Sequence, residues 1–253
     1  MHKFFVDPND IHLDIGEIYI KGEDVKHIQR VLRLQEGQNV EIGNGLGTDY
    51  TAVIDRIEKD KILTRIVEAR RSTVESELRV TLFQSIPKST KMDLIIQKCT
   101  ELGVHSIVPI NTKRSIVQLD DPRACEKKLM RWRRIAYEAA KQSRRSVIPK
   151  VEDIRDLNAI WSQINQLDIN IVAYENERTI GIKDLINSQI SPNYKNIGIF
   201  VGPEGGFDET EIRMLEEKGV FPISLGPRIL RTETAGFVVV TILMYELGDI
   251  GGF

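Results

Sequence analysis

The chain has 253 residues, of which 41% are hydrophobic and 28% charged, and its formal net charge is −2. This composition is ordinary for a globular protein and excludes a disordered or fibrous one. Cys99, Cys125 and the four histidines lack the spacing of metal ligands or of a disulfide framework, so we expect metal-free chemistry. The chain has no basic leader before an apolar run and no stretch of about 18 apolar residues, so we expect a cytoplasmic protein without a membrane partner.

The first part of the chain consists of short apolar segments separated by glycine-containing turns, a pattern that predicts a small β-barrel. Within it, residues 23–34 place Val25, Ile28, Val31 and Leu32 on one face of a helix. The polar segment 70–77 has no periodicity, so we place the domain boundary there, between residues 1–73 and 74–253. The expected strands of the barrel are residues 18–20, 39–42, 49–57 and 62–68.

After this boundary the pattern changes to apolar runs that alternate with amphipathic helices. It predicts an α/β domain whose mostly parallel sheet is covered by helices on both faces. Cys99 lies on the apolar stripe of one expected helix with Ile95 and Leu102, so we interpret it as a core residue and not as a nucleophile. The expected strands are residues 79–86, 107–110, 169–174, 197–201 and 220–225, and the expected helices include 92–102 and 123–143.

The small net charge hides an uneven distribution along the chain. Residues 113–150 contain 12 Lys and Arg against 4 Asp and Glu, whereas residues 151–220 contain 6 against 13. Lys and Arg that contact phosphates provide most of the affinity of nucleic-acid-binding proteins. We therefore expect the basic segment, together with the N-terminal barrel, to hold a nucleic acid.

Two glycine-containing loops follow expected strands and are the candidates for a ligand site. Residues 202–207 (GPEGGF) precede a helix start marked by Asp208 and Glu211, and residues 226–235 (GPRILRTETA) follow the next strand. Loops at the carboxyl ends of strands in an open α/β sheet can converge on one pocket. Neither has a dinucleotide or triphosphate motif. Each could instead be a structural turn, with Arg231 and Glu233 as a charge pair and Thr232 or Thr234 as an N-cap.

The strings GPEGGF at 202–207 and SLGPRILRTETA at 224–235 closely resemble the RsmE family of SPOUT RNA methyltransferases. The resemblance covers nearly the whole chain, because it extends to HIQRVLRL at 27–34, KCTELGV at 98–104, IVPINTKRS at 107–115 and AAKQSRRSVIP at 139–149. It implies an N-terminal PUA-like β-barrel and a C-terminal SPOUT α/β domain with a trefoil knot. It also implies an S-adenosyl-L-methionine cofactor, a homodimer, and N3 of a uridine in 16S ribosomal RNA of the small ribosomal subunit as the methyl acceptor.

The resemblance also assigns residues to the cofactor site. It places the cofactor against the two loops and the end of the strand near residue 174. The implied cofactor-binding residues are Tyr174, Glu175, Val201, Gly202, Pro203, Glu204, Gly205, Gly206, Leu225, Gly226, Ile229, Leu230, Thr232, Thr234 and Ala235.

For catalysis we expect Arg231 and Arg114 to orient the uridine or its phosphate, and Glu204 and Glu233 to shape the pocket or accept a proton. The sequence does not identify the base. Two other functions stay open, namely ribose 2'-O methylation and a non-catalytic ribosome assembly factor. The expected RNA-binding residues are Arg30, Arg33, Arg114, Arg144 and Arg145.

Overall fold

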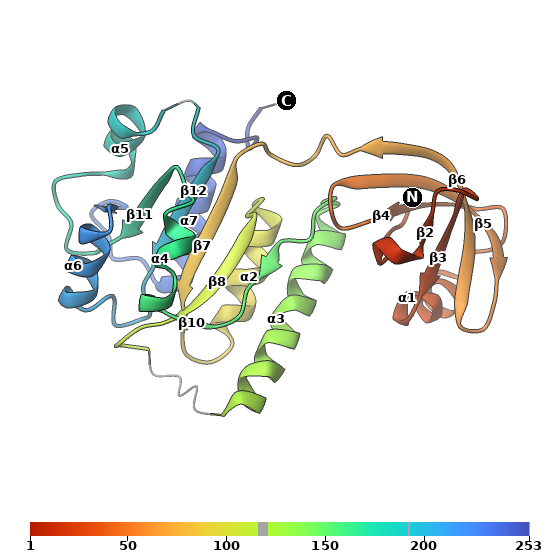
Figure 1. Ribbon diagram of the computed structural model, residues 1–253, viewed down its shortest axis with the longest axis horizontal. Helices are drawn as coiled ribbons and strands as arrows, with labels where there is room; N and C mark the ends of the chain where they lie inside the picture. Colours follow the sequence, from red (N-terminus) through yellow and green to blue (C-terminus); the bar gives the residue numbers. More distant parts are fainter. Residues whose placement is uncertain (116–120, 192, 253) are drawn as a thin grey trace. The chain divides into compact units, whose positions relative to one another are not determined.

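The computed structural model describes residues 1–115, 121–191 and 193–252, and the chain forms two compact units (Figure 1). The first unit consists of Met1–Glu75 and Ala140–Ile148, and the second of Ser76–Ala139 and the chain from Pro149 onward. The segment Ala140–Ile148 therefore belongs to the first unit although it lies far along the chain, which the sequence does not predict.

The first unit contains a six-stranded sheet with the order β1-β4-β5-β6-β3-β2. Neighbouring strands are antiparallel except for β1 and β4, which are parallel. The expected helix is present as α1 (Glu23–Lys26), which continues into a π-helical segment, His27–Leu32. The expected position of Val31 on the apolar face is wrong, because the side chain is 66% exposed in the π-helical segment, whose period differs from that of an α-helix. Strands β1 and β2 are too short to give a periodic signal in the sequence. The strands are β1 (Lys3–Phe5), β2 (Ile11–His12), β3 (Glu17–Lys21), β4 (Asn39–Gly43), β5 (Thr48–Ile57) and β6 (Lys61–Arg71).

The second unit is built on a seven-stranded sheet in which every pair of neighbouring strands is parallel, as the continuous apolar runs predict. Its order is β10-β8-β7-β12-β11-β13, and β9 also pairs with β8. The strands are β7 (Arg79–Ser85), β8 (Ser106–Asn111), β9 (Lys150–Val151), β10 (Arg155–Asp156), β11 (Ile169–Ala173), β12 (Asn196–Val201) and β13 (Val220–Ile223).

Six helices of the described chain belong wholly or mainly to this unit, and both faces of the sheet are covered. Consecutive strand residues alternate between two hydrophobic clusters: Ile199 packs with residues of α2, α3, α5 and α7, and Phe200 packs with residues of α4 and α6. The helices are α2 (Lys91–Glu101), α3 (Pro122–Gln142), α4 (Trp161–Ile164), α5 (Ile182–Gln189), α6 (Glu209–Glu217) and α7 (Thr232–Glu246).

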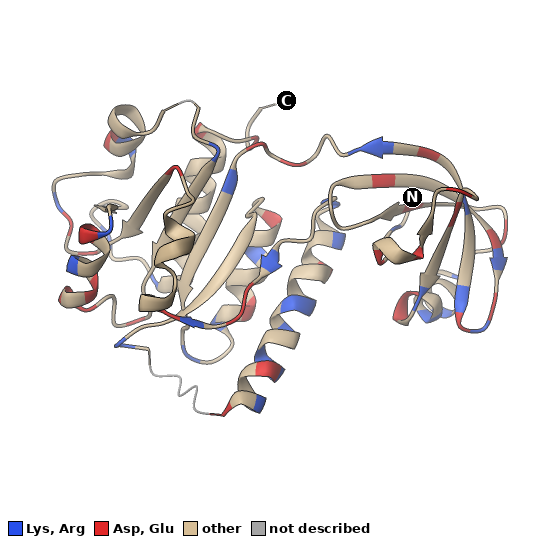
Figure 2. Cartoon of the chain, in the orientation of Figure 1, with Lys and Arg blue, Asp and Glu red and all other residues tan. Residues whose placement is uncertain are grey.

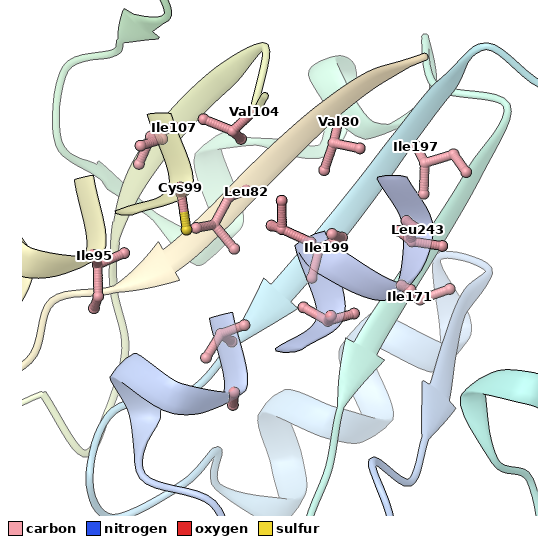
Figure 3. Close-up of a cluster of buried hydrophobic side chains, with 14 of the residues drawn as sticks. Val80, Leu82, Ile95, Cys99, Val104, Ile107, Ile171, Ile197, Ile199 and Leu243 are labelled. Carbon is pink, nitrogen blue, oxygen red and sulfur yellow. The ribbon is translucent and has the colours of Figure 1, made fainter. Parts of the chain in front are cut away.

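Cys99 lies inside the first of these clusters. Figure 3 shows its sulfur among Leu82, Ile95 and Ile107. The side chain is fully buried, and this burial raises the pKa of the thiol above its ordinary value because the thiolate would lose its hydration. The prediction that Cys99 is a core residue is confirmed.

The chain crosses itself in its last third. Strand β11 lies between β12 and β13, so the chain passes to the far side of β11 after β12. After β13, helix α7 returns and contacts β12, β7 and α2. This crossing brings the ends of three parallel strands and the start of α7 to one edge of the sheet. Among the described residues, no helix combines the length and apolar character that a membrane span requires.

Candidate active site

A cavity of 530 Å³ lies at the carboxyl ends of β11, β12 and β13. Three segments form most of its wall, namely residues 173–175 after β11, residues 201–206 after β12 and residues 224–232 after β13. The strands of the two glycine loops are not neighbours in the sheet, because β11 lies between them. The end of β11 is therefore the middle of the site, which explains why Tyr174 and Glu175 line the cavity.

The volume and lining of this cavity suit a small polar organic molecule of nucleoside size. Apolar side chains such as Val201, Leu225 and Leu230 form part of the wall. Charged side chains of both signs complete it, and they come from Lys91, Glu175, Arg178, Glu204, Arg228 and Arg231. A ligand with an apolar ring, hydroxyl groups and a zwitterionic end would find suitable partners in such a wall.

Two glycines of these loops have conformations that other residues rarely adopt. Gly206 has φ +65°, and a Cβ there would overlap the carboxylate of Glu175. Gly226 has φ +113°. A third glycine, Gly202, is constrained by space, since a Cβ would lie 3.1 Å from the backbone nitrogen of Phe207. These positions let the backbone form the cavity wall itself.

A chain of hydrogen bonds connects three of the segments around the cavity. Gln84, at the end of β7, donates from Nε2 to Oγ1 of Thr232 at 3.0 Å. Thr232 in turn donates from Oγ1 to the carbonyl of Gly202 at 2.6 Å. Thr232 is only 5% exposed, and it is the first residue of α7. The N-cap of this helix is Arg231, whose side chain makes no capping hydrogen bond. The alternative that Thr232 or Thr234 caps the helix is therefore wrong.

Arg114 holds the glycine-rich loop from outside the cavity. Its Nη1 donates to the carbonyl of Gly205 at 2.9 Å, and its Nη2 lies 3.3 Å from Oδ2 of Asp208. The buried carboxylate of Glu211 accepts the backbone N–H groups of Lys113 at 2.8 Å and of Asp208 at 2.9 Å. These contacts fix the loop after β12 to the loop after β8. The capping box of Asp208 and Glu211, which starts α6, is confirmed.

Lys91, the first residue of α2, carries an ammonium group that faces two acidic residues. Its Nζ lies 2.8 Å from Oε1 of Glu204 and 3.6 Å from Oε2 of Glu233. The hydrogen bond with Glu204 raises the pKa of Lys91 above its ordinary value. Burial opposes the charge of Glu204, but hydrogen bonds from Lys91 and from backbone amides outweigh it, so the pKa of Glu204 is below its ordinary value. Both groups are therefore charged at neutral pH.

The structure brings together most of the residues that the sequence assigns to the site. The expected residues that do not line the cavity are Thr234, Arg114 and Glu233. Lining residues that the site assignment missed include Lys91, Arg178, Ser224, Pro227 and Arg228. The expected residues that line the cavity are Tyr174, Glu175, Val201, Gly202, Pro203, Glu204, Gly205, Gly206, Leu225, Gly226, Ile229, Leu230, Arg231, Thr232 and Ala235.

The missed residues had only a weak signal in the sequence. Arg178 and Arg228 lie in loops that follow strands, where a solvated arginine is equally common. Lys91 starts a helix and lies 113 residues before Glu204 of the glycine-rich loop, and only the pairing of β7 with β12 brings the two together.

The expected RNA-binding arginines differ in their surroundings. In the first unit, Arg30, Arg33 and Arg144 are exposed. Arg145 is only 6% exposed, and its Nη2 lies 2.7 Å from Oε2 of Glu75 in the same unit. This burial favours a structural role for Arg145 and makes Arg144 the more accessible of the two neighbours.

Acidic residues from outside the basic segment 113–150 neutralise part of its positive charge. Figure 2 shows Lys and Arg residues along α3. Several of them pair with acidic residues from elsewhere in the chain, including Arg131 with Asp93, and Arg133 with Asp153 at 2.7 Å. The positive charge of the segment is therefore balanced by more acidic residues than the four that lie within it. Among the described residues, no cluster of side chains has the composition of a metal site.

Comparison with known proteins agrees with this architecture. Residues 74–244 match the family described as an RNA methyltransferase domain, and residues 20–67 match an RNA methyltransferase PUA domain. Ribosomal RNA small subunit methyltransferase E of Bacillus subtilis is 34% identical over 249 residues, which cover 97% of each chain. The Aquifex aeolicus protein of the same name is 33% identical over 245 residues, covering 96% of this chain and 99% of the relative.

Two solved structures share the fold over nearly their full length. Ribosomal RNA small subunit methyltransferase E from Neisseria gonorrhoeae, bound to S-adenosyl methionine, is 30% identical with a TM-score of 0.85, and 99% of each chain is covered. A methyltransferase from Legionella pneumophila in complex with the same cofactor is 28% identical with a TM-score of 0.84, and 98% of each chain is covered. The expected α/β fold with a PUA-like domain is thereby confirmed, and the chain belongs to the ribosomal RNA small subunit methyltransferase E family.

Proposed function

We propose that this protein transfers a methyl group from S-adenosyl-L-methionine to N3 of a uridine in 16S ribosomal RNA of the small ribosomal subunit. The observation that carries the proposal is the cavity at the ends of β11, β12 and β13, built by the two loops whose sequences resemble the RsmE family. Family membership supports the reaction class and the ribosomal substrate. The choice of uridine N3 over a ribose hydroxyl follows from the resemblance of the loops.

The residues present suit this cofactor. Glu175 provides carboxylate oxygens that can accept hydrogen bonds from ribose hydroxyls, and Val201, Leu225 and Leu230 provide an apolar surface for a purine. Positive and negative side chains of the wall can pair with the carboxylate and the amino group of the methionine part. The bound cofactor supplies an already activated methyl group, so no nucleophilic side chain is needed.

The contribution of the protein to the chemistry is placement and charge. Methylation at N3 requires loss of the N3 proton, and the resulting anion carries its negative charge on the uracil ring. Arg231 is exposed and lines the cavity, so its guanidinium can stabilise this anion or the adjacent phosphate. Glu204 is an ionised carboxylate in the wall, and its pairing with Lys91 and its lowered pKa favour a role in shaping the pocket over a role as the base. Arg114 does not line the cavity, and it stabilises the glycine-rich loop by donating to the carbonyl of Gly205.

The proposal also includes binding of the substrate RNA and of a second copy of the chain. Arg30, Arg33 and Arg144 of the first unit are exposed and available to phosphates, whereas Arg114 of the second unit is exposed but pairs with Asp208. Helix α7 carries Phe237, Val238 and Ile242, which are only partly buried, and Tyr245, which is exposed, so its outer surface suits a homodimer contact. The return of α7 across β12 and β7 supports a trefoil knot. A ribosomal substrate implies a cytoplasmic location.

Mass spectrometry of ribosomal RNA from a deletion strain tests the reaction. We expect loss of one N3-methyluridine from 16S RNA, with restoration by the wild-type gene. Loss of a ribose methyl group would show 2'-O methylation, and an unchanged modification pattern would show a non-catalytic assembly factor.

Light scattering at micromolar protein concentration tests the oligomeric state. A monomer mass with retained activity would contradict the homodimer.

A further inference from the structure

The ammonium group of Lys91 connects two acidic residues that come from different parts of the site. Glu204 belongs to the glycine-rich loop after β12, and Glu233 lies in the first turn of α7. The two acidic residues are 29 positions apart in sequence, yet both lie within 4 Å of the same Nζ atom, at 2.8 and 3.6 Å. Lys91 also lines the cavity, whereas Glu233 does not. The lysine therefore connects the wall of the cavity to Glu233 in the first turn of α7.

The two acidic residues depend on Lys91 to different degrees. Glu204 also accepts a hydrogen bond from the backbone N–H of Lys88 at 3.1 Å. Glu233 has a side chain only 13% exposed, and its buried Oε2 accepts no hydrogen bond from the described residues. A buried carboxylate oxygen without a donor is costly unless a positive charge lies nearby. The nearest cation to Glu233 that the described chain places against it is Lys91.

We propose that Lys91 is a positioning residue, whose ammonium group fixes the glycine-rich loop to the start of α7 and so sets the shape of the cofactor cavity. The inference deepens the proposed function, because it assumes that this cavity takes S-adenosyl-L-methionine. Lys91 acts through Glu204 and Glu233. With two carboxylates against one ammonium, its charge is neutralised locally and does not repel a sulfonium cation.

Calorimetry with purified protein tests the inference, using S-adenosylmethionine and S-adenosylhomocysteine as probes. Lys91→Met should weaken both ligands about tenfold, equivalent to about 1.4 kcal/mol, because the loop loses its charged anchor. Lys91→Arg should recover most of the affinity, since the guanidinium keeps the charge. The double variant Lys91→Met with Glu204→Gln should bind no more weakly than Lys91→Met alone, because both changes remove the same contact.

Lys98→Met is the matched control. Lys98 lies on the same helix and pairs with Glu101 at 2.7 Å outside the cavity, so its loss should leave both affinities unchanged. Unchanged affinities in Lys91→Met would overturn the inference, as would selective tightening of S-adenosylmethionine, which would show a direct charge effect. Fully additive losses in the double variant would also overturn it. If the wild-type protein bound neither probe, the proposed function itself would fail. Glu204→Gln alone tests the same contact if Lys91→Met does not fold.

Discussion

Thr232 shows how one hydroxyl group can fix the geometry of a site. Its Oγ1 accepts from Gln84 and donates to the carbonyl of Gly202, so β7, the glycine-rich loop and α7 meet at one atom. All three groups are buried, so water cannot replace the partners that a substitution removes. Buried polar groups left without a partner cost more than the net value of the bond that was lost.

Thr232→Val keeps the shape of the side chain and removes its hydroxyl. We expect the free energy of unfolding to fall by about 1–3 kcal/mol, because the Gly202 carbonyl and the Gln84 amide both lose a partner. Urea denaturation measures this change. The control is Thr241→Val on the same helix, whose hydroxyl donates only to the Phe237 carbonyl one turn earlier. Equal losses in the two variants would contradict a special role for Thr232.

Neighbouring glycines of the same loop differ in what they tolerate. Gly206→Ala places a methyl group against the Glu175 carboxylate at a positive φ, so we expect cofactor affinity to fall by tenfold or more. At Gly205 a Cβ meets only carbon atoms of Arg114 at 3.5 Å, an ordinary contact, so Gly205→Ala should bind nearly normally. Calorimetry on both folded variants checks the difference. Equal affinities would show that the Gly206 backbone does not shape the cavity.

Among the elements, α2 has a double role. Its apolar face packs Ile95, Ile96 and Cys99 into the core, and its first residue, Lys91, reaches the active site. The helix can do both because β7, which precedes it, pairs with β12 in parallel. Parallel neighbours end at the same edge of the sheet, so the start of α2 and the glycine-rich loop lie together.

Cys99→Ser tests the core role of this helix. The hydroxyl would be fully buried in an apolar cluster, so we expect a loss of about 1–3 kcal/mol in the free energy of unfolding. Methylation per folded molecule should not change, because the thiol is inaccessible and its pKa is raised by burial. Chemical denaturation and a methyl-transfer assay below the unfolding transition measure the two effects. Abolished activity in fully folded protein would instead point to a thiolate mechanism.

At the scale of the whole molecule, the count of charged residues along the chain differs from the charge that the folded protein presents to a ligand. The basic segment 113–150 has 12 positive residues, but ion pairs with Asp93, Asp153 and Glu75 neutralise Arg131, Arg133 and Arg145. Contacts with phosphates depend on arginines that are still exposed and unneutralised. The structure therefore favours Arg30, Arg33 and Arg144 over Arg145 as the RNA contacts.

Arg144 and Arg145 are neighbours that we expect to differ in function. Arg144→Gln should weaken binding to small-subunit RNA and lower the salt slope of the affinity by about 1, because one phosphate contact is lost. Arg145→Gln should mainly lower the melting temperature, since it leaves the partly buried carboxylate of Glu75 without its ion pair. Filter binding at several salt concentrations and thermal denaturation separate the effects. A salt slope that changes only in Arg145→Gln would contradict this assignment.

The sequence by itself determined the local features of this protein. Apolar runs predicted the longer strands of the parallel sheet, periodicity predicted the stripe of α2, and a capping box predicted the start of α6 at Asp208. Each of these signals depends on residues close in the chain. Several short elements escaped prediction, among them β1, β9, β10, α4 and α5. The string 224–235 carried the family resemblance and so indicated the cofactor loops, but spacing alone left these loops as possible turns.

Only the tertiary structure decided which distant residues meet. The insertion of β11 between β12 and β13 made Tyr174 and Glu175 the middle of the cavity, and the pairing of β7 with β12 brought in Lys91. Burial separated Arg145 from Arg144, which the sequence treats alike. Strand order and burial result from the packing of the whole chain. They depend on contacts between residues far apart in sequence, and no local pattern encodes them.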